Sequence, residues 1–338
     1  MMILSIGCRE KISGASMSRR RSPFKKAAIT AALATSAFVL CLVGTPNAFA
    51  SGAGSRPSSK WIIAVQPTAT ATALSDQAKE LESFLESKLG RDIEVLFPTS
   101  YAGVVEALRY GHAHAAFMGA WPARLAEQTA GASVLLAEVR EVMVDGKLGE
   151  APNYRSFWIV APDSPYQTLA DLKGKKAAFP SPISTSGYVA PLDKLVSEKL
   201  ITRPVSGPAD PKAYFSEVLF AGGYPQGFEA LKAGQVDVTV IAGDVPEKLF
   251  TEVLAVSRVI AEQGPIPSHA VVVSKALGAA DRERLASALL ELNAPEHRPL
   301  MRKFVSGIFV RFERAGTGHL AALAGMLDRT GLEFAEKK

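Results

Sequence analysis

Short apolar segments alternate with amphipathic segments through most of this chain, and this alternation constrains the fold more than any other feature. The run Trp61–Val65 is typical of a buried strand, and the leucines that follow at spacings of three and four predict a helix ending at Gly90. A strand is expected at residues 93–97, and a helix capped by Ser100 then leads to another strand at 113–118. Such alternation is typical of α/β folds, so we expect mainly parallel sheets flanked by helices.

The same unit occurs again further along the chain. The segments Glu106–Gly111 and Glu229–Gly234 both have the pattern of a helix end with a glycine stop, and an apolar run follows each. Two similar lobes would produce this repetition, but so would any pair of α/β units, and both interpretations stay open. Further strands are expected at 157–161, 176–179 and 271–273, and further helices at 187–200, 281–292 and 320–327.

The first fifty residues have the pattern of an export signal. Basic residues at 19–21 and 25–26 precede an apolar run at 27–43, and Ala48–Ala50 supplies the small residues that a signal peptidase requires. The apolar run is short for a membrane span, although an uncleaved anchor is the alternative. We expect residues 1–50 to be a cleaved signal peptide and the mature protein to be periplasmic.

Removing that leader changes what the charge implies. The whole chain carries 38 basic and 33 acidic residues, a net charge of +5. Seven of the basic residues and one acidic residue lie in the leader, so the mature chain keeps 31 and 32, a net charge of −1. The positive charge is therefore no indication of nucleic-acid binding. Cys8 and Cys41 also lie in the leader, which excludes disulfide and thiolate chemistry in the exported protein.

The strongest candidate for a binding site is a run of three hydroxyl-bearing residues, Ser184, Thr185 and Ser186, called the socket below. The socket lies between an expected strand and an expected helix, so its hydroxyl groups lie beside the free N–H groups of a first helical turn. No Lys or Arg lies between Phe179 and Tyr188. The socket could hold a small oxyanion with neutral donors; capping of the helix by one hydroxyl is the simpler alternative.

Sequence motifs for other chemistry are absent. The chain has no Gly-x-Ser-x-Gly element, and after the leader it has no Ser-x-x-Lys, so a serine nucleophile lacks support. It also lacks the phosphate-binding loop of nucleotide hydrolases and the glycine fingerprint of dinucleotide-binding folds. We therefore expect a protein that binds its ligand without a cofactor and is not an enzyme.

Few histidine and acidic residues are candidates for binding a metal or a ligand. His112 and His114 would share one face of a strand, which could suit a metal or be a surface pair, but no third ligand is evident, and we expect no metal site. Asp244 could cap the helix that follows Pro246 or contact a ligand. His269 lies in a loop fixed by two prolines, just before an expected strand.

Three tyrosines lie near the boundaries of expected elements: Tyr101, Tyr154 and Tyr224. Aromatic side chains at such boundaries often line pockets. Simple packing explains each of them equally well when it is taken alone, so both interpretations stay open.

Several separate stretches resemble the periplasmic phosphonate- and phosphite-binding proteins of ABC importers. Their order and spacing fit that family over nearly the whole chain after the leader. The Ser-Thr-Ser-Gly-aromatic element is the specific one, whereas the Asp-Leu-Lys-Gly-Lys run occurs in many binding proteins of this fold. The stretches are Ser100–Gly103, Tyr154, Asp171–Lys176, Ser184–Tyr188 with Pro191, Gln235–Val238 and Ile266–Pro267.

The resemblance implies the two-lobe fold of type II periplasmic binding proteins, with two crossings between the lobes and the ligand in the cleft. One lobe would comprise residues 51–154 and 262–338, and the other residues 155–261. The socket would bind the phosphonyl oxygens, and Tyr101 and Tyr154 would donate hydrogen bonds from the opposite lobe. The implied partners are a phosphonate or phosphite and an ABC permease, and we expect a monomer.

Two positions depart from the family pattern and bear on the ligand. Tyr224 stands where such relatives have a pocket histidine, and His269 stands where they have an aspartate. Asp244 matches an acidic residue that reaches the ammonium group of aminoalkylphosphonates, but here it would act without a second carboxylate. We therefore expect a simpler anion, such as phosphite or methylphosphonate. A protonated His269 would add a positive partner and make the affinity depend on pH.

Two other functions could use the same residues. A periplasmic sensor of this fold could present its closed form to a membrane histidine kinase, and an exported hydrolase could use a socket serine. The hydrolase lacks a recognisable base beside that serine. We expect capture of a small phosphorus oxyanion and its delivery to an ABC permease.

Overall fold

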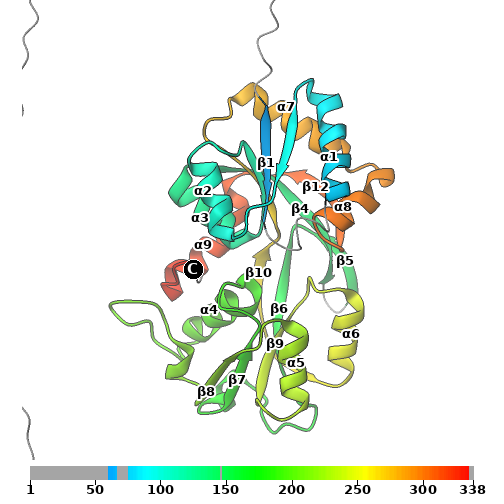
Figure 1. The fold of residues 1–338 in the computed structure, drawn as a ribbon. Coiled ribbons are helices and arrows are strands. Elements are labelled where there is room, and N and C mark those ends of the chain that lie inside the picture. The colour runs from blue at the N-terminus through cyan, green and yellow to red at the C-terminus, as the bar shows by residue number, and fades with distance from the viewer. Residues whose placement is uncertain (1–59, 67–74, 145–146, 335–338) are drawn as a thin grey trace, which may run out of the picture. The chain divides into compact units, whose positions relative to one another are not determined.

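The computed structural model describes residues 60–66, 75–144 and 147–334, and the expected signal peptide lies outside these ranges. The described strands form two sheets, each flanked by helices (Figure 1). The α/β class that the alternation predicts is therefore confirmed. Within the described ranges, no helix is both long enough and apolar enough to cross a membrane.

The first sheet takes strands from both ends of the described chain. Its order is β2-β1-β3-β11-β4-β12, and β5 pairs with β4. Its strands are β1 (Trp61–Val65), β2 (Ile93–Leu96), β3 (Ala115–Met118), β4 (Ser133–Val144), β5 (Lys147–Ala151), β11 (Ala270–Val273) and β12 (Phe309–Arg314). Its helices are α1 (Ser75–Leu89), α2 (Tyr101–Arg109), α3 (Ala120–Ala130), α7 (Ala279–Glu291) and α8 (Arg298–Phe304).

The second sheet is formed by the middle of the chain. Its order is β8-β7-β9-β6-β10. Its strands are β6 (Asn153–Val160), β7 (Lys176–Phe179), β8 (Glu217–Phe220), β9 (Val238–Ala242) and β10 (Arg258–Pro267). A π-helical turn (Thr185–Val189) leads into α4 (Ala190–Ser197), and α5 (Tyr224–Lys232) and α6 (Glu247–Ala255) follow.

The two sheets share one strand order, which supports the interpretation of the sequence repeat as two similar halves. In the first, β3 lies between β1 and β11; in the second, β9 lies between β7 and β6. One repeated segment contains the end of α2, just before β3, and the other contains the end of α5, just before β9. The two segments therefore occupy equivalent positions in the two sheets.

Both sheets are mixed, which corrects the expectation of mainly parallel sheets. β1 pairs in parallel with β2 and β3, and β7 with β8 and β9, but the remaining pairs are antiparallel. The four strands at the passages between the sheets, β4, β6, β10 and β11, all pair antiparallel with their neighbours. Antiparallel neighbours need no crossover connection, unlike consecutive parallel strands.

The first sheet is covered on both faces, which explains its apolar strands. Figure 1 shows α2 and α3 on one face and α1, α7 and α8 on the other. Within β1, Trp61 and Ile63 pack into the cluster that contains Leu81 and Leu85 of α1, whereas Ala64 packs into the cluster on the opposite face. Strands buried on both faces read as continuous apolar runs, and this is why β1 is recognisable from its sequence.

The strands that link the two sheets belong to the second sheet over their full length. β6 begins at Asn153, β10 ends at Pro267, and these two residues are paired. The expected boundaries after residues 154 and 261 therefore fall inside strands. Tyr154 lies in the same sheet as the strand before the socket, so its expected place in the opposite lobe is wrong.

The C-terminal helix packs against the second sheet, although the strands before it belong to the first. α9 (Ala321–Thr330) contacts α4 and β10. Arg329 donates to both carboxylate oxygens of Asp193 on α4, at 2.6 and 2.9 Å. The N–H of Ala209 donates to the Thr330 carbonyl at 2.7 Å. The expected segment 262–338 thus contacts both sheets and is not confined to one.

Candidate functional site

A cavity of about 410 Å³ lies where parallel strands of both sheets end. Gln66 follows β1, Gly119 follows β3, Ser181 follows β7 and Asp244 follows β9, and all four line the cavity. Ligands of open α/β sheets bind at such carboxyl ends. The lining residues are Gln66, Tyr101, Gly119, Ala120, Pro122, Tyr154, Ser181, Ile183, Ser184, Thr185, Ser186, Gly222, Tyr224, Asp244, Pro267, His269 and Phe334.

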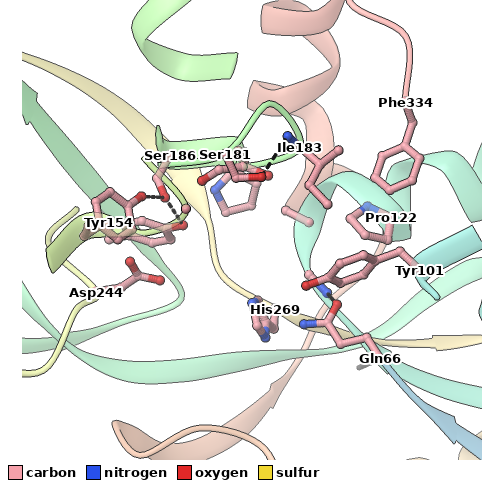
Figure 2. Close-up of a pocket in the computed structure, with 17 residues that line it drawn as sticks. Gln66, Tyr101, Pro122, Tyr154, Ser181, Ile183, Ser186, Asp244, His269 and Phe334 are labelled. Carbon is pink, nitrogen blue, oxygen red and sulfur yellow. Dashed lines mark hydrogen bonds between the residues drawn. The ribbon is translucent and has the colours of Figure 1, made fainter. Parts of the chain in front are cut away.

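The structure brings together every residue that the sequence suggests for the binding site. These eight residues line one cavity, although they are up to 168 positions apart in the chain, and Figure 2 shows several of them facing the same space. Their contact with a ligand stays a prediction. The residues are Tyr101, Tyr154, Ser184, Thr185, Ser186, Tyr224, Asp244 and His269.

The three socket hydroxyls have different surroundings. Ser184 Oγ accepts a hydrogen bond from the Gly187 N–H at 2.9 Å, so Ser184 caps the π-helical turn, as the simpler alternative expected. Ser186 Oγ accepts one from the Tyr154 hydroxyl at 3.1 Å and lies 2.7 Å from the Tyr224 hydroxyl. Thr185 also lines the cavity. A single cap accounts for Ser184 but not for Thr185 and Ser186, whose hydroxyls lie at the cavity wall.

The two tyrosines beside Ser186 remain protonated. Burial is the main cause that raises the pKa of Tyr154 well above its ordinary value, and the nearby Asp244 carboxylate raises it further. The same two causes raise the pKa of Tyr224. A protonated phenol has one hydrogen to donate. Tyr224 can donate it to an anion near Ser186, whereas Tyr154 donates to Ser186 Oγ and would have to release that bond first.

Four helical segments begin at the cavity. α2 begins at Tyr101, α3 begins at Ala120 and α5 begins at Tyr224, and the π-helical turn that leads into α4 begins at Thr185. Each of these residues lines the cavity. The start of a helix carries free N–H groups and a partial positive charge, and each favours an anion by roughly 0.3 to 1 kcal/mol. The cavity therefore attracts negative charge without a cationic lining residue.

Asp244 belongs to a buried charge cluster that sequence reasoning missed. Arg140 on β4 donates to an oxygen of Asp244 and to an oxygen of Glu138, both at 2.8 Å. The side chains of Arg140 and Glu138 are 4% and 1% exposed. Burial raises the pKa of both carboxyl groups, and the guanidinium between them opposes that rise.

This pairing decides between the two interpretations of Asp244. Pro246 holds the N-cap position of α6 and the helix has no side-chain cap, so the expectation that Asp244 caps it is wrong. Asp244 lines the cavity, with one oxygen bonded to Arg140. A ligand's ammonium group would need the negative charge of Asp244 as its partner. The positive charge of Arg140 already offsets part of that negative charge.

His269 lies in the cavity wall but does not carry the expected charge. Its Nδ1 is 3.8 Å from a Glu138 oxygen, and 30% of its side chain remains exposed, toward the cavity. Burial lowers the pKa of His269 well below its ordinary value, and the nearby Arg140 lowers it further. The ring is therefore neutral at neutral pH, which does not support the protonated partner that the sequence suggests.

Gln66 and Gly119 form a polar contact in the wall contributed by the first sheet. The Gly119 N–H donates to Gln66 Oε1 at 2.5 Å, and Gln66 is buried. A Cβ at Gly119 would approach both this oxygen and His269 Nε2, at 3.3 and 3.4 Å. The contact orients the Gln66 amide group at the edge of the cavity (Figure 2).

The remaining histidine candidates do not form a metal site. His114 Nδ1 accepts a hydrogen bond from the Ile62 N–H at 3.1 Å, and its ring stacks on Trp61. His112 contacts Tyr110 instead. Within the described part of the chain, no group of three or more potential ligands is arranged to hold a metal ion.

Some lining residues carry a signal in the sequence and others do not. Gln66 is a polar residue directly after a buried strand, the same signal that pointed to the socket. The sequence gives no sign that Arg140 is part of the site, because its carboxylate partner Asp244 is 104 positions away in the chain. Phe334 reaches the cavity only through the packing of α9 on the second sheet, which no local pattern predicts.

Comparison with known proteins places this chain in a family. Residues 63–317 match the model described as ABC transporter, phosphonate, periplasmic substrate-binding protein. The phosphate-import protein PhnD of Mycolicibacterium smegmatis is 31% identical over 176 residues, which cover 52% of each chain. The phosphonates-binding periplasmic protein of Escherichia coli is 26% identical over 227 residues, which cover 65% of this chain and 62% of that protein. The matches thus span about half to three fifths of these relatives.

A solved structure supports the fold. The crystal structure of the binding-protein component of an ABC phosphonate transporter from Pseudomonas aeruginosa has a TM-score of 0.57 and 20% sequence identity, covering 79% of this chain and 85% of that chain. The fold type expected from the sequence resemblance, that of the periplasmic binding proteins, is therefore confirmed.

Replacing Gly187 by Ala should distort the socket. An added Cβ would lie 2.1 Å from Pro180 Cγ and 2.8 Å from Ser184 Oγ, so the turn must shift. We expect at least a tenfold loss of affinity for methylphosphonate and a loss of about 1 to 3 kcal/mol in the free energy of unfolding. Calorimetry and urea unfolding measure both. Gly307→Ala is the control, because a Cβ there meets nothing within 4 Å. Unchanged affinity in Gly187→Ala would contradict the account.

Replacing Arg140 by Met should strongly destabilise the protein. Glu138 and Asp244 would be left buried without a cation, which costs about 3 to 5 kcal/mol in the free energy of unfolding at pH 7. Because burial raises the pKa of both carboxyl groups, protonation as the pH falls should restore part of this loss. Urea unfolding at pH 7 and pH 5 tests this. Arg311→Met removes an exposed pair with Glu150 and should cost at most about 1 kcal/mol. Equal losses in the two variants would refute the argument.

The ratio of the dissociation constants of the parent and the His269→Asn variant should stay constant between pH 6 and pH 8. A neutral His269 changes no charge in that window, and titration of the ligand affects both proteins equally. Calorimetric titrations with methylphosphonate at several pH values provide the ratio. A variant that weakens relative to the parent as the pH falls would show that His269 is protonated after all.

Proposed function

This chain belongs to the family of periplasmic phosphonate-binding components of ABC transporters, as its sequence predicts, and we propose that it captures a small phosphorus oxyanion in the cavity between its two sheets. The family consists of substrate-binding proteins, not enzymes. The proposal rests on one observation above all, which is the convergence of neutral hydrogen-bond donors and helix starts on one cavity. Among the described residues that line it, none is Lys or Arg.

The donors suit a tetrahedral oxyanion. Thr185 and Ser186 offer hydroxyl groups at the end of β7, and Tyr154 and Tyr224 offer phenol groups on either side of Ser186. Tyr101 approaches from the first sheet. A phosphonyl group has three oxygens that accept hydrogen bonds, so it can use donors from several directions. Planar carboxylates present only two oxygens and would leave part of this set unused.

The strength of binding requires donors from both sheets. A hydrogen bond to a charged group contributes about 1.5 to 3 kcal/mol, and a micromolar site needs about 8 kcal/mol after the costs of association. The donors of the second sheet alone barely reach that value. We therefore propose that the two halves close over the ligand by a hinge motion, which excludes water and brings Tyr101 into contact with it.

The same proposal covers the fate of the ligand. The leader would direct export of the protein to the periplasm. There, closure would form the surface that an ABC permease recognises, and the protein would deliver its ligand to that permease. The curated relatives include a phosphate importer and a phosphonate-binding protein, so a shared oxyanion site can serve more than one phosphorus ligand. Phosphite, methylphosphonate and related anions without an ammonium group are the ligands that we propose, since Arg140 already pairs with Asp244.

The double variant Thr185→Ala/Ser186→Ala should lose at least a hundredfold in affinity for methylphosphonate and keep its fold. This variant leaves the Ser184 cap intact, whereas the triple variant that includes Ser184→Ala should also abolish binding and lose about 1 kcal/mol of stability. Calorimetry and thermal unfolding provide the two readouts.

A matched control removes two hydroxyl groups elsewhere. Ser87 and Thr129 are exposed on helices, and each donates to a carbonyl of the preceding turn. The double variant Ser87→Ala/Thr129→Ala should bind like the parent. If Thr185→Ala/Ser186→Ala also bound like the parent, the socket would not be the binding site.

A further inference from the structure

The cavity has two chemically different ends, a feature that deepens the proposed function and rests on it. Figure 2 shows Ser186, Tyr154 and Asp244 at one end. At the other end lie the side chains of Tyr101, Pro122, Ile183 and Phe334. The first end holds the polar groups already described, whereas the second presents mainly carbon, and a ligand that fills the cavity must match both.

The volume leaves room beyond the phosphonyl group. Methylphosphonate has five non-hydrogen atoms, and at roughly 30 Å³ for each, the share of one water molecule in the liquid, it occupies about 150 Å³. In this conformation, before the proposed closure, the cavity measures about 410 Å³. Space for further non-hydrogen atoms therefore remains here once the oxyanion occupies the socket, and the apolar side chains border that space.

Phe334 is held firmly at the apolar end. Its ring meets the Trp121 ring edge to face, with centroids 5.4 Å apart, and lies 6.4 Å from the Tyr101 ring. The helix before it is anchored, because Arg329 pairs with both oxygens of Asp193. The aromatic part of this wall is therefore built from α2 and α3, which flank the first sheet, and from the C-terminal segment.

The polar end offers only a weakened site for a ligand's ammonium group. Asp244 is the one carboxylate among the described lining residues, and Arg140 donates to it at 2.8 Å. An ammonium group placed against Asp244 would also lie close to this guanidinium, whose charge would repel it. At the opposite end, the apolar wall would desolvate an ammonium group without pairing it, which is unfavourable.

We infer that the preferred ligand is a phosphonate whose substituent is uncharged, apolar and longer than methyl, with its phosphonyl group in the socket and its substituent against Pro122, Ile183 and Phe334. Each methylene group buried at the wall should raise the affinity about fourfold. Propylphosphonate has two more methylene groups than methylphosphonate and should therefore bind about sixteenfold more tightly.

Calorimetry with the purified protein and four ligands tests the inference. Propylphosphonate and 2-aminoethylphosphonate have the same number of non-hydrogen atoms and differ in one terminal group, so their comparison isolates the ammonium charge. We expect propylphosphonate to bind at least tenfold more tightly than 2-aminoethylphosphonate, and methylphosphonate and phosphite to bind more weakly than propylphosphonate.

The outcomes separate this inference from the proposed function. If phosphite, methylphosphonate or 2-aminoethylphosphonate bound as tightly as propylphosphonate, the inference would be overturned while the proposed capture of phosphorus oxyanions stood. If none of the four ligands bound, both would be overturned.

A pair of variants tests the location of the wall. Phe334→Ala should reduce the preference for propylphosphonate over methylphosphonate at least threefold. Tyr110→Ala removes an aromatic ring that is 64% exposed, and it should leave this preference unchanged. An unchanged preference in Phe334→Ala would overturn the placement of the substituent at this wall.

Discussion

The contact of Arg140 with Glu138 and Asp244 is the interaction on which the site depends. Arg140 lies on β4 of the first sheet, and Asp244 follows β9 of the second, so the guanidinium joins the two halves behind the cavity. It also sets the charge of the cavity wall, because it pairs with the one carboxylate among the described lining residues. Structure and selectivity thus depend on the same buried cation.

The remainder of the site follows a different physical principle, which is the use of neutral donors. Hydroxyl groups, phenols and helix starts surround the cavity, and burial keeps Tyr154 and Tyr224 protonated. A lining lysine or arginine would bind many anions strongly. Neutral donors in fixed positions instead bind most tightly an anion whose oxygens match those positions. The shape and protonation state of the anion therefore contribute more to selectivity than its charge.

The sequence predicts this fold and site unevenly, for physical reasons. β1, β3 and β9 are recognisable because both of their faces are buried, and the socket is recognisable because its three hydroxyls are adjacent in the chain. β4 was not expected, because its buried charged residues Glu138 and Arg140 interrupt the apolar pattern of the strand. The ion pairs that neutralise these charges form only in the folded protein. The neutral state of His269 could not be predicted for the same reason, because it results from burial and from Arg140, which is distant in the sequence.

A crystal structure with bound methylphosphonate tests the central claim most directly. The account predicts phosphonyl oxygens within about 3.2 Å of the hydroxyls of Thr185, Ser186 and Tyr224, and no Lys or Arg nitrogen within that distance. A ligand bound outside the cavity, or one held inside it by a lysine or arginine side chain, would contradict the claim that neutral donors of this socket bind the oxyanion.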